Sequence, residues 1–169
     1  WPLLALLFPL AISCLALEAA GEGRAARLTL ATVLLGGGLS VHWVVYPMIN
    51  FGGVPLPLAI LFMLLLVAVL SVYYIIYCLL LRFYRKNLPG PLLLLAGALT
   101  WGALAYLRCW LFTGVSWCAL SSAMAGRPVF AQGASIFVMY GLSALYALAA
   151  LCFAPLIVRG LPGRIIPQA

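Results

Sequence analysis

The stretch that decides the fold is LPLAILFMLLLVAVLSVYYIIYCLLL, residues 56–81. It carries no charged side chain and is longer than the about 20 apolar residues that an α-helix needs to cross the hydrocarbon core of a bilayer. Its apolar residues follow one another without the alternation of lipid-facing and lumen-facing positions seen in membrane β-barrels. A helix is the other structure that satisfies every backbone N–H and C=O inside lipid. Residues 56–81 therefore predict a transmembrane helix.

The rest of the chain has the same character. Hydrophobic residues make up 67% of the sequence and charged residues 7%, whereas about a quarter of a soluble domain is charged. So few polar side chains could not cover a surface that faces water. We expect an all-α integral membrane helix bundle, a single domain over residues 1–169, with spans at about residues 2–17, 28–49, 56–81, 92–112 and 130–158.

The basic residues predict the orientation of this bundle. Seven of the nine basic residues, all except Arg108 and Arg127, lie in the segments that follow the first, third and fifth spans. Cytoplasmic loops are enriched in Lys and Arg, so these gaps and the C-terminus are expected in the cytoplasm, and residues 50–55 and 113–129 outside. The net charge of +7 then reflects topology and contact with anionic headgroups, not binding of nucleic acid.

The sequence contains no set of residues that would hold a metal, a cofactor or a catalytic centre. Its five cysteines are scattered through apolar runs with no C-x-x-C pair. Both glutamates and the single lysine, Lys86, lie in the predicted cytoplasmic gaps, whereas Cys109 and Cys118 lie about 30 Å away across the core. A thiol needs a nearby cation or base to become a thiolate. We therefore expect no catalytic residue, metal or cofactor in this chain.

Arg108, within YLRCWLFTG, is the main candidate for a binding residue. A charge inside a membrane helix is costly and marks a functional site by default. The alternative is an arginine that snorkels to the outer headgroups and holds a phosphate nonspecifically. The residues expected to join Arg108 in a lipid portal, or else to act as interfacial anchors, are Trp43, Trp110, Thr113, Gly114 and Trp117.

Other unusual residues have structural interpretations. His42 and the run Gly36-Gly37-Gly38 are expected to serve helix packing, since small residues let membrane helices approach closely. The tyrosines at 73, 74 and 77 are expected to form part of an interfacial belt.

Three stretches together resemble the membrane domain of apolipoprotein N-acyltransferases. The first is WVVYPMINFGGVPLPLA, residues 43–59, whose FGGxPLPLA core is the motif most specific to the family. The second is YLRCWLFTGVSW, residues 106–117, similar to the family's WLRxWLxTGFPW. The third combines Gln132 with YGLS at residues 140–143. The family's Glu before WLR is Ala105 here, and its Phe-Pro before the last Trp is Val115-Ser116.

The resemblance implies an inner-membrane protein that supports transfer of an acyl chain from a phospholipid to the N-terminal amine of a diacylglyceryl lipoprotein. In this family the chemistry belongs to a nitrilase-like domain with a Glu-Lys-Cys triad, which residues 1–169 do not contain, so we expect them to be inactive alone. The positions expected to form turns or pack helices are Gly52, Gly53, Pro55, Pro57, Tyr140 and Gly141.

Two other functions remain open from the residues. One is a stand-alone membrane binding or scaffold protein that has lost the catalytic domain. The other is a small transporter, which the lack of paired charges near mid-membrane disfavours.

Overall fold

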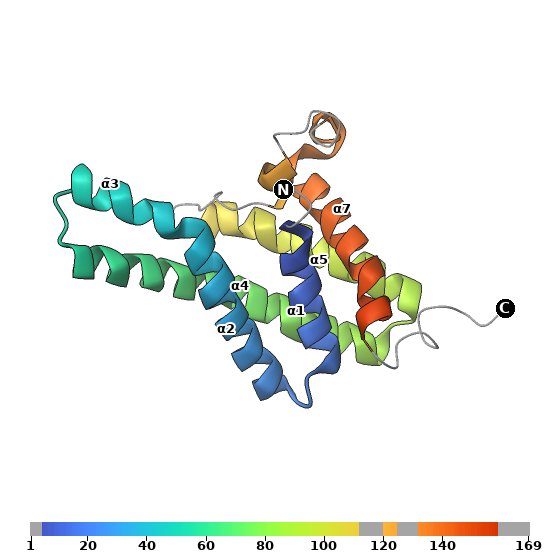
Figure 1. Ribbon diagram of the computed structural model, residues 1–169. Helices are drawn as coiled ribbons and strands as arrows, with labels where there is room; N and C mark the ends of the chain where they lie inside the picture. The colour runs from blue at the N-terminus through green and yellow to red at the C-terminus, as the bar shows by residue number, and fades with distance from the viewer. Residues whose placement is uncertain (1–4, 112–119, 125–131, 159–169) are drawn as a thin grey trace.

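The computed structural model describes residues 5–111, 120–124 and 132–158, and it contains helices and no β-strand in these ranges. Figure 1 shows the elements in order from blue to red. They are α1 (Leu7–Glu18), α2 (Glu22–Val41), the 3-10 helix η2 (His42–Val44), α3 (Val45–Asn50), α4 (Leu56–Asn87), α5 (Gly90–Trp110), the 3-10 helix η4 (Leu120–Met124) and α7 (Ala134–Ile157).

Four of the helical segments are long and apolar enough to cross a membrane. They are Glu22–Asn50, Leu56–Asn87, Gly90–Trp110 and Ser135–Ile157, and α1 is a fifth, shorter apolar helix. The prediction of an all-α membrane bundle is confirmed.

Two helices extend beyond the predicted spans. α2 begins at Glu22 instead of residue 28, and α4 continues to Asn87 instead of ending at residue 81. Five of the basic residues expected in loops, at positions 24, 27, 82, 85 and 86, therefore lie on helix ends. The prediction counted apolar residues only, but Arg, Lys and Glu are good helix formers, and Glu at an N-terminus or Arg and Lys at a C-terminus interact favourably with the helix dipole.

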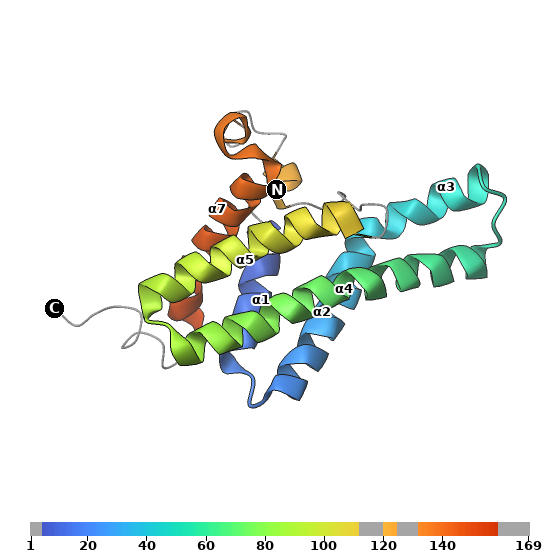
Figure 2. The same cartoon turned by 180° about the vertical axis from the view of Figure 1, so that it is seen from behind.

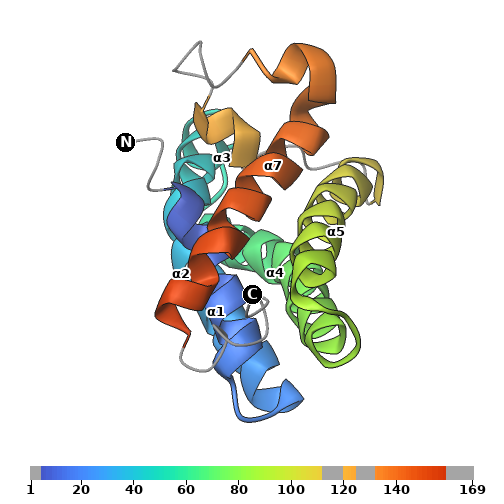
Figure 3. The same cartoon turned by 90° about the vertical axis from the view of Figure 1, so that its right-hand side faces the viewer.

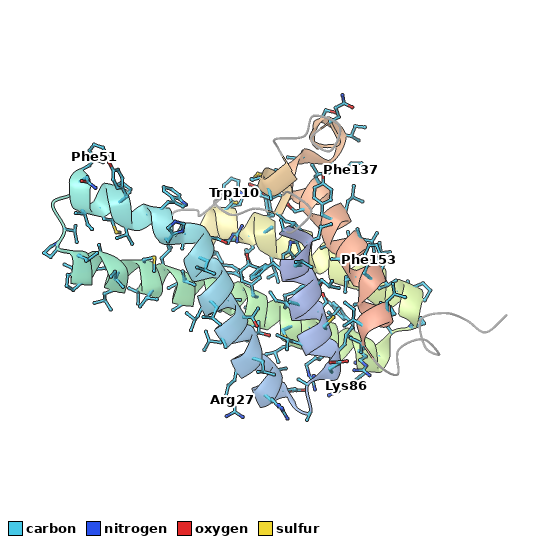
Figure 4. All side chains as sticks on the ribbon, viewed as in Figure 1. Arg27, Phe51, Lys86, Trp110, Phe137 and Phe153 are labelled. Carbon is cyan, nitrogen blue, oxygen red and sulfur yellow. The ribbon has the colours of Figure 1, made fainter. Side chains whose placement is uncertain are left out.

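Polar contacts join the helix ends at one end of the bundle. The Nζ of Lys86 lies 3.3 Å from Oε1 of Glu22. The Nη1 of Arg82 donates to the carbonyl oxygens of Ala16 at 2.8 Å and Ala19 at 2.9 Å, near the C-terminus of α1. Figure 4 shows Lys86 and Arg27 at this end. We call it the basic end.

α4 is the central helix of the bundle. It contacts α1, α2, α3 and α5, while α7 packs on α1 and α5. Figure 2 shows α4 as a long diagonal behind which α1 and α2 cross, and Figure 3 shows α7 with α5 on one side and α1 on the other. Large side chains from these helices fill the core; Ile12, Val33, Tyr77, Leu81 and Leu151 are almost wholly buried.

The chain bends at η2, where α2 ends. α3 then runs beside the first half of α4, so that the two form an arm that projects from the bundle (Figures 1 and 2). The turn at the tip needs glycine: Gly53 has φ +63°, and a Cβ on Gly52 would lie 2.7 Å from the carbonyl oxygen of Met48. Pro55 is the N-cap of α4, and Pro57 lies in its first turn, where a missing N–H costs no helical hydrogen bond.

α7 changes direction at Val138, whose φ of 58° and ψ of 174° are not helical. The turn before it lies across the rest of the helix (Figure 1), and places Phe137 over Gly141, where an added Cβ would meet that of Phe137 at 3.1 Å. Beyond this bend α7 packs closely on α5. A Cβ added to Gly102 of α5 would lie only 3.1 Å from the carbonyl oxygen of Tyr140, so glycine allows this approach.

Candidate functional site

Arg108 lies in the last turn of α5 and is buried inside the bundle, with 5% of its surface exposed. Its Nη1 donates a hydrogen bond of 3.0 Å to the hydroxyl of Tyr74 on α4. Its Nε is buried and has no hydrogen-bond partner among the described residues. A buried charge normally has a full set of partners. Arg108 is therefore buried and does not snorkel outward, and the described residues use only part of its hydrogen-bonding capacity.

Aromatic rings surround this arginine. The ring centroids of Phe8 and Tyr74 lie 5.1 Å apart, those of Tyr74 and Trp101 5.6 Å, and those of Tyr77 and Trp101 4.9 Å. Tyr77 is 1% exposed, and its hydroxyl lies 3.4 Å from the Oγ of Ser13. The expectation of an interfacial belt is wrong for Tyr74 and Tyr77, because this part of α4 faces α1 and α5. Their hydroxyls have partners inside the bundle, as buried tyrosines require.

No acidic side chain balances the charge of Arg108. The sequence has two acidic residues. Glu22 pairs with Lys86 at the basic end, and Glu18 is the last residue of α1. Figure 4 shows Trp110, two residues after Arg108, at the opposite end of the bundle from Lys86. The site therefore holds a buried positive charge with neither of the two acidic side chains beside it.

A cavity of about 840 Å³ lies between the helices, and Arg108 forms part of its wall. Its walls come from the first half of α1, the second half of α2, the middle of α4, the second half of α5 and η4. This volume lies within the range of ligand sites, about 300–1,000 Å³. Most of the wall is apolar. The polar contributors are Thr32, Ser40, Tyr74, Arg108 and Ser122.

η4 covers part of this cavity and is attached to α7 by a buried serine pair. The Oγ of Ser143 donates to the Oγ of Ser121 at 3.1 Å, and the backbone N–H of Ser121 lies 3.2 Å from the same Ser143 oxygen. Leu120, Ser122 and Ala123 of η4 then line the cavity. Ser143 therefore fixes the element that covers the cavity near Arg108.

The other predicted portal residues lie elsewhere. Trp110 is 71% exposed with its ring 6.0 Å from that of Tyr106, and Trp43 is 48% exposed on η2. Neither lines the cavity as far as the described residues show, so their role in a portal stays a prediction. Thr113, Gly114 and Trp117 lie outside the described residues.

Tyr140 packs edge-on against Tyr106, with ring centroids 5.3 Å apart. Two residues of the cavity wall, Tyr74 and Gly36, could not be singled out from the sequence. Tyr74 is indistinguishable from its neighbour Tyr73 in an apolar run, and Gly36 from the glycines that follow it.

The described residues offer no group of His, Cys, Asp or Glu that could hold a metal ion. No disulfide links the four cysteines among them, which are Cys14, Cys78, Cys109 and Cys152. Lys86 and Glu22 meet at the basic end, away from Cys109 at the end of α5.

Comparison with known proteins agrees with this picture of a lipid-embedded helix bundle. Residues 1–152 match the family model described as the apolipoprotein N-acyltransferase N-terminal domain. The apolipoprotein N-acyltransferase of Haemophilus ducreyi is 38% identical over 111 residues, which are 66% of this chain and 21% of that protein. The chain thus spans about a fifth of the length of this relative. No solved structure matches it.

The family match covers most of the chain, and the structure has the membrane helices expected from the sequence. The chain therefore belongs to the apolipoprotein N-acyltransferase family, as its N-terminal membrane domain.

Proposed function

We propose that these helices present a phospholipid for N-acylation of a lipoprotein. The phospholipid phosphate binds Arg108, and the acyl ester remains at the membrane surface beside it. One acyl chain of the phospholipid is then transferred to the N-terminal amine of a diacylglyceryl lipoprotein. The partners of this domain are accordingly phospholipid and lipoprotein.

The observation that carries this proposal is the buried guanidinium of Arg108 in the wall of a mostly apolar cavity, with an Nε that has no hydrogen-bond partner among the described residues. A guanidinium binds phosphate through parallel N–H···O bonds, which are shorter and stronger than neutral ones. The ligand that fits has an anionic head and an apolar body. A phospholipid has both.

The basic residues support a particular orientation. Lys86, Arg27 and Arg82 lie at the end opposite Arg108, and positively charged helix ends are typical of the cytoplasmic side. Arg108 then faces the outer leaflet of the bacterial inner membrane. A lipoprotein with its amine outside would meet the phospholipid there.

The chemical step needs groups that the described residues do not bring together. Acyl transfer through a thioester requires a thiolate, a base and an oxyanion-stabilising donor within hydrogen-bond reach. We assign these to the nitrilase-like domain that the family resemblance implies. In that scheme the cysteine thiolate attacks the ester carbonyl of the phospholipid and forms a thioester, and the expelled glycerol oxygen takes a proton and leaves as a lysophospholipid. The lipoprotein amine then attacks the thioester, forms an amide and frees the thiolate.

The test is photo-crosslinking of the protein to a photoactivatable phospholipid in phosphatidylethanolamine and phosphatidylglycerol vesicles. Loss of a hydrogen bond to a charged group costs about 1.5–3 kcal/mol, so we expect Arg108→Ala to lower crosslinking about tenfold or more and Arg108→Lys to recover part of it. Arg85→Ala, which removes the same charge at the basic end, is the control and should leave crosslinking unchanged.

Equal crosslinking of the wild type, Arg108→Ala and Arg108→Lys would show that Arg108 contacts lipid only nonspecifically, and would refute the proposal. Crosslinking that depends on Arg108, without acyl transfer when a nitrilase-like domain is supplied by fusion, would instead identify a binding or scaffold protein.

A further inference from the structure

We propose that Ser143 on α7 is a positioning residue for the binding of phospholipid at Arg108. Ser143 acts through η4, which it holds in place beside Arg108, and does not itself touch the lipid. This inference rests on the proposed function, because it takes a phospholipid phosphate to be the ligand of Arg108. It adds a residue on a helix that the proposed function does not use.

η4 has one side toward the cavity and another toward α7. Leu120, Ser122 and Ala123 line the cavity of about 840 Å³. Ser121 is not among the lining residues and is 7% exposed. Its Oγ and its backbone nitrogen lie 3.1 Å and 3.2 Å from the Oγ of Ser143. Figure 3 shows η4, in gold, beside α7. The serine pair therefore supports the cavity wall from the side that faces away from the cavity.

Leu120 connects this support to Arg108. It is 8% exposed and lines the large cavity together with Tyr74, Trp101 and Arg108. The same four residues also line a second cavity of about 20 Å³, which has room for about one water molecule. Residues that border so small a space are neighbours, so Leu120 lies beside Arg108 and its hydrogen-bond partner Tyr74. Displacing η4 would open that side of the guanidinium to water.

Packing does not explain a serine at position 143. Among the described residues of α7, Ser143 is the only buried polar one, and the other buried residues are leucines and alanines. An alanine would fill the position without burying a hydroxyl, which is unfavourable unless the hydroxyl is hydrogen-bonded. What the serine provides is an acceptor for the backbone N–H of Ser121. Ser121 is the second residue of η4, and the first N–H groups of a helix have no partner inside it.

A fixed η4 strengthens the contact between Arg108 and phosphate by keeping water away. Hydrogen bonds and charge pairs are stronger in a low dielectric than in water. Without the oxygen of Ser143, the buried N–H of Ser121 lacks its acceptor unless η4 moves, and a loss of this kind corresponds to about fivefold in an equilibrium. The affinity for phospholipid should therefore fall. The maximal amount bound should not, because Arg108 is still present.

The experiment titrates a photoactivatable phosphatidylglycerol into dodecyl maltoside micelles that hold the protein. This detergent has no phosphate and so does not compete for Arg108. We expect Ser143→Ala to raise the mole fraction of phosphatidylglycerol at half-maximal crosslinking about fivefold, with the maximum unchanged. A variant that only unfolds in part would lose maximum crosslinking at an unchanged half-saturation point.

Ser135→Ala is the matched control. It is the same change on the same helix, at an exposed position whose hydroxyl donates to the carbonyl oxygen of Gln132 at 2.7 Å. Ser135 lines neither cavity among the described residues. Ser135→Ala should therefore titrate like the wild type.

A disulfide tests the same link within one folded protein. A variant with Ser121→Cys and Ser143→Cys, and with Cys118→Ala to prevent mispairing, replaces the serine pair with two thiols. Oxidation should join η4 to α7 covalently and keep the half-saturation point of the wild type. Reduction should raise that point about fivefold, because a thiol is a weak hydrogen-bond partner.

The inference would be overturned if Ser143→Ala kept the half-saturation point of the wild type, or lost only the maximum. Equal titrations of the oxidised and reduced disulfide variant would overturn it as well. Arg108→Ala separates this failure from that of the proposed function, because it should remove saturable crosslinking. If Arg108→Ala weakens crosslinking and Ser143→Ala does not, only the positioning role fails. If Arg108→Ala also titrates like the wild type, the proposed function fails.

Discussion

Replacing Tyr74 with phenylalanine removes one oxygen, the acceptor of the hydrogen bond from Nη1 of Arg108. The ring itself stays, so its edge-on contact with Phe8 and its contact with Trp101 are kept. The lost interaction is a hydrogen bond from a charged donor in a mostly buried site. Such bonds contribute about 1.5–3 kcal/mol in soluble proteins, and interhelical polar contacts in membranes about 0.6–1.7 kcal/mol. Taking both ranges, we expect Tyr74→Phe to cost about 1–2 kcal/mol.

This cost should appear in two measurements. The free energy of unfolding in mixed micelles should fall by about that amount, because α4 and α5 lose a polar contact. Crosslinking to phospholipid should fall about five- to thirtyfold if Tyr74 orients the guanidinium for phosphate. Tyr73→Phe is the matched control, since Tyr73 is the adjacent residue and makes no hydrogen bond within the described part of the chain. If Tyr74→Phe and Tyr73→Phe behave alike in both assays, Arg108 does not depend on Tyr74 and the reasoning fails.

Three further predictions concern the rest of the bundle. Arg82→Ala should lower the free energy of unfolding by about 3 kcal/mol, because two charge-assisted hydrogen bonds to α1 are lost; Arg85→Ala, measured in parallel by the same denaturation assay, should change it little. Reporter fusions after Lys86 should report the cytoplasm and fusions within residues 114–127 the outside, and the reverse result would overturn the orientation. Residues 1–169 in phospholipid vesicles should leave a diacylated lipopeptide unmodified by mass spectrometry, and triacylated product that is lost in Cys109→Ala would contradict this.

The sequence predicts the fold class well because the rule behind it is strong. Uninterrupted apolar runs in lipid leave the backbone few ways to satisfy its hydrogen bonds, so helices at α4 and α5 follow directly. It predicts helix ends less well, since the signal is apolarity and not helix propensity. Arg85 and Lys86 end the apolar run but continue the helix. The bend at Val138 could not be predicted from the sequence either, because a β-branched residue rarely adopts a positive φ.

The candidate site was predicted in part. Arg108 stood out as a charge in an apolar segment, which is a property of the sequence alone. Its burial and its contact with Tyr74 depend on how α4 and α5 face each other, and no periodicity in an almost wholly apolar run specifies that rotation. The difference between Gly36 and Gly38 has the same origin. Each is a glycine in the same run, and only the position of the neighbouring helices gives one a cavity and the other open space.

The energetics of Arg108 favour a binding role over a structural one. Replacing buried charges with apolar residues of similar size is often neutral or stabilising, so a leucine or methionine at this position would serve the packing of α5 at least as well. The arginine instead keeps a buried Nε without a partner in the described residues and has no carboxylate at its end of the bundle. An anion from the membrane would complete its hydrogen bonds and balance its charge. The site is therefore expected to gain stability when a phosphate binds, since a ligand that binds only the folded state stabilises it.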